Sequence, residues 1–297
     1  MRRVSLIYNP TAGASRKGAA RIPQILAALS KRDVRVEPRA TAACGDATKL
    51  AQQAVAEGCE TLIVCGGDGT INEAAQALVG SSTALAIWPC GTANVLAKDL
   101  RLSHRPEVLA DLIASGQTRM ISVGRATKPE TGWQRYFLLM AGVGLDAAIV
   151  KRVDLALKRR AGVGAYFAAG LGFLADWRLT PLSLSINGNN HDATFAVIAN
   201  AASYGGWFTL TPKAQLEEDQ LDVCLFNSRS RLEYLSYALF SLTGSHTQRA
   251  RVLYQKTQAA SAQSSAEAFV QLDGELVGSL PMCFESVPRA LRVIAPH

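Results

Sequence analysis

A short glycine-rich segment carries the clearest chemical signal in this sequence. Residues 66–70 read Gly-Gly-Asp-Gly-Thr, directly after the apolar run 61–65 and before a helical pattern that starts near Ile71. Glycines after a strand let backbone N–H groups approach a ligand closely, and the N-terminus of the following helix adds partial positive charge. The segment therefore predicts an anion site, and a phosphate is the anion that fits it best.

Asp68 makes this interpretation more specific. A carboxylate that faces a polyphosphate repels it, unless a bound Mg²⁺ bridges the two groups. The alternative is a structural turn in which Asp68 only caps the helix. Two common phosphate-binding fingerprints do not fit, because the sequence contains neither G-x-x-x-x-G-K-[ST] nor G-x-G-x-x-G with a ribose-binding acid downstream.

Two further loops of small residues occupy equivalent places in the pattern. Residues 9–13 follow the apolar run 4–8, and residues 89–94 follow the apolar run 84–88. Right-handed crossovers bring such loops to the carboxyl edge of one parallel sheet, where open α/β sheets bind their ligands. We therefore expect three loops to line one crevice. Arg16 and Lys17 either add charge at its mouth or simply begin a solvated helix.

The periodicity of apolar residues predicts the elements that hold these loops. Strands are expected at 4–8, 34–36, 61–65 and 84–88, and helices near 18–30, 46–57 and 71–79. Alternation of strands and helices favours a parallel sheet with helices on both faces. The first domain, residues 1–122, is therefore predicted to be a three-layer α/β domain.

The pattern becomes β-rich after about residue 120. Strands are expected at 120–126, 133–141, 182–186, 194–200, 221–226, 269–272 and 291–295, and helices at 145–176 and 230–244. Asn187-Gly188 and Asp273-Gly274 are hairpin signals, because both central residues of a type I′ turn need positive φ. The small, polar residues 259–265 suggest an exposed loop. The second domain, residues 123–297, is therefore predicted to be an antiparallel β-sandwich.

Composition limits the class of protein further. The chain has 297 residues, of which 48% are hydrophobic, which excludes a disordered or collagen-like protein. Its formal charge of +7 favours anionic partners. Six cysteines without a C-x-x-C pair favour reduced core thiols and a cytoplasmic location. There is no G-x-S-x-G or H-E-x-x-H motif to indicate a hydrolase, and no apolar run near the about 20 residues that span a bilayer.

Taken together, the three loops resemble a known family. Asn9-Pro10-x-Ala12-Gly13, Gly66-Gly67-Asp68-Gly69-Thr70-x-Asn72-Glu73 and Pro89-x-Gly91-Thr92-x-Asn94-x-x-Ala97 occur in this order. This triple motif resembles the diacylglycerol kinase catalytic family, which includes bacterial soluble lipid kinases and sphingosine kinases, and the resemblance spans nearly the whole chain. It implies an ATP-binding first domain, a lipid in the interdomain cleft, and transfer of the γ-phosphoryl group of ATP to a lipid hydroxyl.

The resemblance also implies which residues contact the nucleotide. By position these are Asn9, Pro10, Thr11, Ala12, Gly13, Thr41, Gly66, Gly67, Asp68, Gly69, Thr70, Ile71, Asn72 and Thr92. The implied cofactors are ATP and Mg²⁺. Diacylglycerol, phosphatidylglycerol and sphingoid bases all present a hydroxyl near a headgroup, so the lipid itself stays open.

A candidate general base lies in the second domain. Residues 270–275 read Val-Gln-Leu-Asp-Gly-Glu and resemble the Asp-Gly-Glu motif that carries the proton acceptor of this family. Strand alternation puts Asp273 on the face opposite Leu272, where it could accept the proton of an attacking hydroxyl. The alternative is an ordinary hairpin turn, as expected for Asn187-Gly188. The resemblance decides in favour of the base.

The resemblance further implies a structural Mg²⁺ in residues 212–222. Its ligands would be the carbonyls of Gln215 and Gln220 and the side chain of Glu218. Here the sequence departs from the family, since Glu218 replaces an aspartate and Asp219 replaces a glycine. Oxygen ligation of a hard cation survives this change, but its geometry must differ.

Lipid contact is expected from acids and from a basic segment. The resemblance places Asp146, in the turn 142–147, and Glu275 near the lipid substrate, although Asp146 could equally cap the helix that begins there. Basic residues at 151–152 and 158–160 precede aromatic and apolar residues up to Trp177, which suits peripheral contact with the anionic inner face of the membrane. A solvated helix face is the alternative.

Two other functions were weighed against a lipid kinase. A kinase of the NAD kinase type shares residues 66–70 but leaves the other two loops unexplained. The interpretation as a basic nucleic-acid-binding protein is supported only by the formal charge of +7, because the sequence contains no recognised nucleic-acid-binding module. We therefore expect ATP and a lipid, and no nucleic acid, as partners.

Overall fold

The computed structural model describes residues 3–13, 18–145, 147, 179–204 and 208–296. Contacts between Cα atoms divide the chain into two units. The first consists of Met1–Ile121 and Arg289–His297, and the second of Ser122–Pro288. Residues 289–297, which the sequence suggested for the second domain, therefore group with the first.

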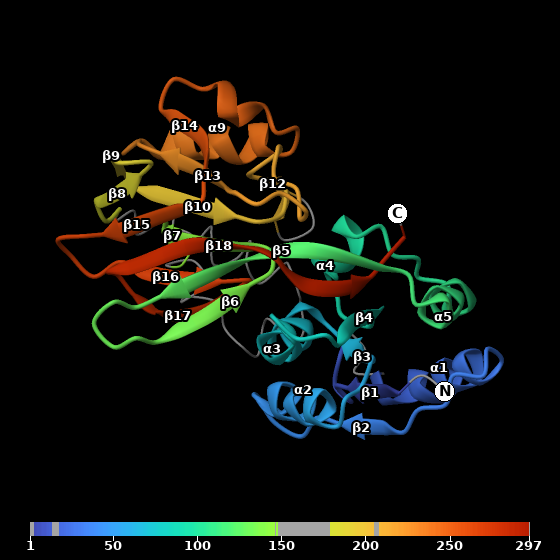
Figure 1. Cartoon of the computed structure of the whole chain (residues 1–297). Helices are drawn as coiled ribbons and strands as arrows, with labels where there is room; N and C mark the ends of the chain where they lie inside the picture. Colours follow the sequence, from blue (N-terminus) through green and yellow to red (C-terminus); the bar gives the residue numbers. More distant parts are fainter. Residues whose placement is uncertain (1–2, 14–17, 146, 148–178, 205–207, 297) are drawn as a thin grey trace. The chain divides into compact units, whose positions relative to one another are not determined.

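The first unit is an α/β fold, as predicted. Its elements are β1 (Val4–Tyr8), α1 (Gly18–Ser30), β2 (Pro38–Ala40), α2 (Asp46–Ala56), β3 (Thr61–Gly66), α3 (Asp68–Leu78), β4 (Ala84–Pro89), α4 (Val95–Asp99) and α5 (Pro106–Ser115). The strands run parallel in the order β2-β1-β3-β4. Helices α2 and α3 pack together on one face of this sheet and α1 and α5 on the other (Figure 1).

Local sequence explains this layering. Every residue of β3 and of β4 is buried, as expected for central strands that are covered on both faces. Helix α2 buries Ala47, Ala51 and Ala54, which recur every three or four residues on one side. These small side chains let α2 lie close to α3.

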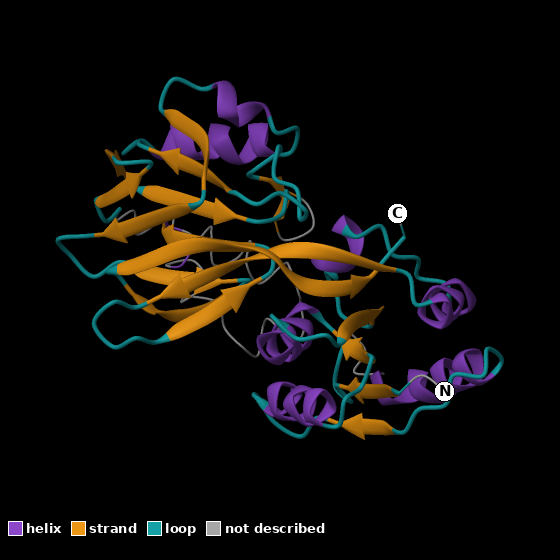
Figure 2. Cartoon of the chain, in the orientation of Figure 1, coloured by secondary structure: helices purple, strands orange, loops and turns teal. Residues whose placement is uncertain are grey.

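The second unit is an antiparallel β-sandwich, again as predicted (Figure 2). Its elements are β5 (Thr118–Thr127), β6 (Gln134–Phe137), β7 (Met140–Gly144), β8 (Leu182–Ile186), β9 (Asn189–Ala193), β10 (Phe195–Ala199), β11 (Ser203–Tyr204), β12 (Phe208–Thr209), β13 (Leu221–Phe226), α9 (Arg231–Ser241), η1 (Ser245–Gln248), β14 (Val252–Thr257), β15 (Ala259–Gln263), β16 (Phe269–Leu272), β17 (Glu275–Ser279) and β18 (Met282–Ile294). One sheet has the order β14-β13-β10-β7-β16-β17. The other layer consists of β8, β9, β15 and β18, with β5 and β6, which belong to the same ten-stranded sheet as β1–β4. The core between them contains buried residues of both sheets, among them Val143, Ile198 and Phe284.

Two long strands take part in both units. Strand β5 starts before Ile121 and continues to Thr127, where it pairs with β6. Strand β18 pairs with β15 through Met282–Glu285, and its last part pairs with β4 through Val293 and Leu85. The chain thus completes the sheet of the first unit only at its C-terminal end.

Some expected elements were wrong. Residues 259–265 are not an exposed loop, because β15 lies between β18 and β8 and buries Ala260 and Ala262. Alanine and serine have weak β-propensity, so the strand is set by its neighbours. Residues 34–36 form no strand, and the run 133–141 divides into β6 and β7. Most of the helix expected at 145–176 lies outside the described residues.

Both predicted hairpin turns are confirmed. Asn187 and Gly188 have φ of 50° and 80° between β8 and β9, and Asp273 and Gly274 have φ of 48° and 85° between β16 and β17. Positive φ at both central residues is the mark of a type I′ turn. No helix in the described part of the chain is long and apolar enough to cross a membrane.

Candidate functional site

Hydrogen bonds join the first of the three loops to the second. Asn9 Nδ2 donates to Thr70 Oγ1 at 3.4 Å, and the backbone N–H of Asn9 donates to the Cys65 carbonyl at 3.0 Å. Asn9 Oδ1 accepts from both the N–H and the hydroxyl of Thr11 at 2.9 Å. The side chain of Asn9 therefore shapes its own loop and holds it at the start of α3.

Asp68 joins the second loop to the third. Its Oδ1 accepts from the N–H of Val95 at 2.8 Å and from the N–H of Leu96 at 3.4 Å, both in the first turn of α4. Burial raises the pKa of Asp68, and these amides oppose the rise. The carboxylate thus serves as a cap, but for α4 rather than for its own helix.

Asn94 closes the third loop. Its Oδ1 accepts from the Gly91 N–H at 2.8 Å and its Nδ2 donates to the Gly91 carbonyl at 2.9 Å. Asn94 itself has φ of 48°, which asparagine tolerates better than most residues.

Glycines let the three loops touch. A Cβ added to Gly91 would lie 2.5 Å from the Cα of Gly67, and one added to Gly13 would lie 2.8 Å from the Cys90 carbonyl oxygen. Gly13 also has φ of 86°. The glycines at these positions are therefore required by the packing of the loops as well as by any ligand.

A pair of thiols lies under the second and third loops. Cys65 Sγ and Cys90 Sγ are 2.7 Å apart, and both residues are buried. The hydrogen bond from Cys65 lowers the pKa of the Cys90 thiol, burial opposes this, and Arg21 lowers it further. The same pairing, with burial, raises the pKa of Cys65. The two cysteines are 25 residues apart in the sequence and form no C-x-x-C motif, so nothing in the sequence indicated that they are paired.

The remaining residues expected at the nucleotide lie around the same edge. Thr41 follows β2, and its N–H donates to the Tyr8 carbonyl at 2.9 Å. Thr92 is exposed, whereas Ile71 and Asn72 are buried in α3. Asn72 Oδ1 accepts from Gln76 at 3.1 Å, which indicates a structural role. Pro10 and Ala12 lie in the first loop, Gly66 is the last residue of β3, and Gly69 lies in the first turn of α3.

The geometry of this edge suits an anion. The structure brings together the loops that follow β1, β3 and β4, and α3 starts at Asp68 rather than near Ile71. The first N–H groups of an α-helix have no acceptor within the helix and carry partial positive charge. N–H groups of this kind at the start of a helix, next to a glycine, can donate hydrogen bonds to an anion.

Asp273 lies in the turn after β16 and has a different environment. Its Oδ1 accepts from the N–H groups of Leu139 and Met140 at 2.9 Å, and its Oδ2 accepts from Leu138 N–H at 2.8 Å. Three successive amides thus orient the carboxylate. Asp273 is a turn residue and not part of strand β16, so strand alternation does not set its direction.

Two buried amide side chains that the sequence analysis missed support this arrangement. Asn200 Nδ2 donates to the carbonyls of Ser122 at 2.8 Å and Leu138 at 3.1 Å. Gln271 Oε1 accepts from Gly274 N–H at 2.6 Å and fixes the turn. Both side chains are almost fully buried. A single Asn or Gln within an apolar strand was the only signal in the sequence.

Of the two acids expected near the lipid, the structure describes Glu275 but not Asp146. Glu275 forms an ion pair with Arg135, with 2.6 Å between Oε2 and the guanidinium nitrogen. Asp146 and the basic residues at 151–152 and 158–160 lie outside the described residues, as do Arg16 and Lys17.

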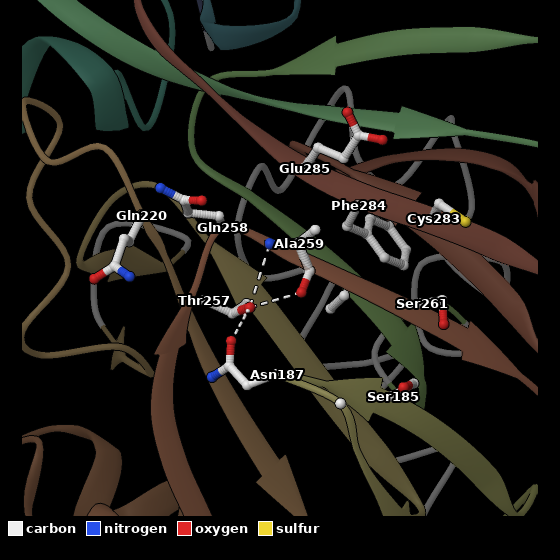
Figure 3. Close-up of a pocket in the computed structure, with 12 residues that line it drawn as sticks. Ser185, Asn187, Gln220, Thr257, Gln258, Ala259, Ser261, Cys283, Phe284 and Glu285 are labelled. Carbon is white, nitrogen blue, oxygen red and sulfur yellow. Dashed lines mark hydrogen bonds between the residues drawn. The ribbon is translucent and has the colours of Figure 1, made fainter.

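The residues expected to hold a structural Mg²⁺ do not fit a divalent cation. The Glu218 carboxylate contacts the ammonium of Lys256, and the Gln215 carbonyl accepts from Glu218 N–H at 3.0 Å. The one charged ligand is thus neutralised by a lysine. Gln220 instead lines an open pocket of about 540 Å³ in the second unit (Figure 3).

That pocket has a polar wall. Thr257 Oγ1 donates to Asn187 Oδ1 at 2.8 Å and accepts from Ala259 N–H at 3.2 Å (Figure 3). Glu285 at its rim pairs with Arg125 at 2.5 Å. Of the residues expected at a site, Gln220 alone is among those lining this pocket.

Comparisons with known proteins agree with this architecture. The model of the diacylglycerol kinase catalytic domain matches residues 3–126, and the model of the YegS C-terminal NAD kinase beta sandwich-like domain matches residues 140–295. A diacylglycerol kinase of Bacillus subtilis strain 168 is 29% identical over 304 residues, covering 100% of this chain and 97% of that protein. One of Staphylococcus aureus strain bovine RF122 is 27% identical over 300 residues, covering 100% and 93%.

Solved structures show the same fold. A Bacillus anthracis structure superposes with a TM-score of 0.82 at 23% identity, covering 99% of this chain and 95% of that one. A diacylglycerol kinase structure from the same organism has a TM-score of 0.74 at 20% identity, covering 99% and 97%. The class of this protein is thus that of the lipid kinases. The chain belongs to the diacylglycerol kinase catalytic family, with a YegS-type C-terminal domain.

Proposed function

We propose that this chain transfers the γ-phosphoryl group of ATP to the hydroxyl of a diacylglycerol-like lipid. The observation that carries the proposal is the convergence of the three loops through Asn9–Thr70 and Asp68–Val95 hydrogen bonds and the close approach of Gly67 and Gly91. The family of the chain supports ATP as the donor. The names of its relatives support a diacylglycerol acceptor.

In this proposal the first unit binds the triphosphate. Backbone N–H groups of residues 66–70, at the N-terminus of α3, donate hydrogen bonds to the phosphate oxygens. Asn9 and Asp68 keep the loops in place and do not contact the phosphates themselves. Mg²⁺ that arrives with ATP supplies charge neutralisation at the phosphates. We assign no metal to Asp68, since its Oδ1 is engaged by the amides of α4.

Asp273 acts on the acceptor. Its carboxylate takes the proton of the lipid hydroxyl while the hydroxyl oxygen attacks the γ-phosphorus and the bond to the β–γ bridging oxygen breaks. The amides of Leu138, Leu139 and Met140 hold the carboxylate in one orientation. Products are the lipid phosphate and ADP.

An assay with radiolabelled ATP and detergent-dispersed lipids tests this function. Diacylglycerol, phosphatidylglycerol and sphingosine are offered separately, and labelled lipid is separated by thin-layer chromatography. We expect label in phosphatidic acid, with little ATP turnover when lipid is omitted. Label on NAD when NAD is offered in place of lipid, or ATP turnover that does not depend on lipid, would contradict the proposal.

A further inference from the structure

Helix α9 presents a row of leucines to solvent. Leu232, Leu235, Leu239 and, at the C-cap, Leu242 are 77%, 48%, 64% and 51% exposed. At 100° per residue they share one stripe of about 80° around the helix. We call these four residues the leucine stripe. Leucines scattered singly on a surface need no explanation, but a continuous row of them indicates an interaction site.

The opposite face of α9 fixes the direction of the stripe. Tyr234, Tyr237 and Ser241 are buried there, and the ring of Tyr237 lies 5.3 Å from that of Phe226 in β13. The Tyr234 hydroxyl is 2.7 Å from Thr194 Oγ1. The helix therefore buries its tyrosine face against the second unit, where Figure 1 shows it outside β13, and the leucine stripe faces away from that core.

Exposed arginines surround the stripe. Residues 229–251 contain four arginines, at positions 229, 231, 249 and 251, and one acid, Glu233. Arg231 lies next to the stripe on the helix, while on the other side Arg249 covers the Phe240 ring at 3.7 Å and Arg251 lies 3.6 Å from Glu233. An apolar row with a basic border matches the interface of an anionic bilayer.

We propose that the leucine stripe and its arginines dock this protein on an anionic membrane surface. The leucines enter the boundary between headgroups and acyl chains, and the arginines contact lipid phosphates. A second copy of the chain fits less well, because a symmetric pairing of this face would bring the two sets of arginines together. The biological role rests on the proposed function, since a diacylglycerol-like acceptor resides in the bilayer.

Vesicle sedimentation tests the proposal. Nucleotide-free protein is mixed with vesicles of phosphatidylcholine, or of phosphatidylcholine with phosphatidylglycerol, at low and high salt. We expect binding to the anionic vesicles that weakens with salt. Leu235→Gln with Leu239→Gln should reduce partitioning at least tenfold, and Arg231→Gln with Arg249→Gln about fivefold per arginine on anionic vesicles. Val108→Gln, which changes an exposed residue of helix α5, is the matched control.

Three further readouts separate the possible outcomes. Circular dichroism must show that the leucine variant is folded, and its activity on detergent-dispersed lipid should equal that of the wild type. Unchanged vesicle binding by this variant overturns the proposal, as does a wild-type dimer that the variant converts to a monomer without loss of binding. Absence of kinase activity in the wild type would contradict the proposed function and leave the docking result to stand by itself.

Discussion

Backbone amides hold the carboxylates of both Asp68 and Asp273, and the surroundings of the two side chains suggest different roles. Asp68 caps α4 and connects two loops of one unit, so its removal is expected to disturb the proposed nucleotide site only indirectly. Asp273 is oriented by three amides within a turn that Gln271 stabilises, and Asn200 holds the Leu138 carbonyl beside those amides. Such a turn is a rigid support of the kind that a proton acceptor needs.

Asp273→Asn is expected to reduce phosphoryl transfer by about 10²–10⁴-fold, the usual contribution of a general base. An asparagine keeps one oxygen for two of the amides but places an NH₂ group against another N–H, which costs about 1–3 kcal/mol of stability. Kinetics and ATP binding of the variant, together with its thermal unfolding, are the measurements. A folded variant that binds ATP and retains a tenth of the activity would show that Asp273 only shapes the turn.

A matched variant distinguishes base loss from a general effect of the substitution. Asp192 is an exposed aspartate on β9 of the same unit. Asp192→Asn should leave activity and unfolding temperature at wild-type values.

The thiol pair gives a second test at this scale. Peroxide should oxidise Cys65 and Cys90 to a disulfide, with two thiols and one H₂O₂ giving the S–S bond and two waters. The sulfurs are already 2.7 Å apart, and the lowered pKa of Cys90 favours its thiolate as the attacking group. Peptide mapping without reductant, in a Cys44→Ser background that removes the exposed thiol, should find the 65–90 bridge. Oxidation of isolated buried Cys224 at the same rate would show that proximity has no effect.

At the scale of elements, the loop before β13 is where the sequence predicted a structural Mg²⁺. Lys256 of β14 lies opposite Asp222 of β13, and its ammonium contacts Glu218. Both side chains of the Lys256–Glu218 pair are about one third exposed, so the pair itself contributes modestly. As a consequence, the ammonium of Lys256 in β14 occupies the place beside Glu218 that a metal cation would take.

Chelation of divalent cations is therefore expected to leave the unfolding temperature of the nucleotide-free protein unchanged. Lys256→Met should lower that temperature and make it rise again with added Mg²⁺, because Glu218 and Asp222 are then uncompensated. Lys31→Met, which changes an exposed lysine of the first unit, is the control. A wild-type protein that chelator destabilises, and that Glu218→Gln makes insensitive to chelator, would restore the metal site.

The buried His246 of η1 is expected to make the free energy of unfolding depend on pH. This histidine is fully buried, and its Nε2 lies 3.0 Å from the Leu210 carbonyl. Burial lowers its pKa from 6.5, so below about pH 6.5 the unfolded state binds more protons than the folded state. The free energy of unfolding should fall as pH drops from there, by at most about 1.4 kcal/mol per pH unit for one proton.

Urea unfolding between pH 5 and pH 7.5 checks this dependence. His246→Gln should flatten the curve below pH 6.5 relative to wild type, and exposed His104→Gln should not. Parallel curves for wild type and His246→Gln would mean that another group dominates.

How much of the fold and the site the sequence could predict depends on how local the signal is. Continuous apolar runs predicted β3 and β4, and positive-φ residue types predicted both hairpins. Strand β15 was missed because its small residues form a strand only between β18 and β8. The spacing of apolar residues predicted helix α9. Because its tyrosine face and its leucine face are both apolar, only the structure shows that the tyrosine face is the buried one.

At the scale of the whole molecule, the local sequence pattern could not predict that residues 289–297 belong to the first unit. The segment 289–297 contributes Leu291, Val293, Ile294 and Ala295 to the first unit, each with at most 2% exposure. Its Ala290 carbonyl also accepts from Gly80 N–H at 2.7 Å. The sequence predicts a strand at 291–295, and because the residues before it are β-rich, the strand was assigned to the second domain.

Truncation after Pro288 should therefore unfold the first unit while sparing most β-structure of the second. Full burial of each large aliphatic side chain contributes about 1.5–3 kcal/mol, so three of them approach the whole stability of about 5–15 kcal/mol of a typical domain. Loss of helical signal in circular dichroism and rapid proteolysis within residues 1–121 are the expected results. Removal of only Pro296 and His297 takes away the hydrogen bond from Arg119 to the Pro296 carbonyl and should leave the unit folded. A chain truncated after Pro288 with wild-type helicity would mean that the parallel strands β1–β4 hold the unit together without β18.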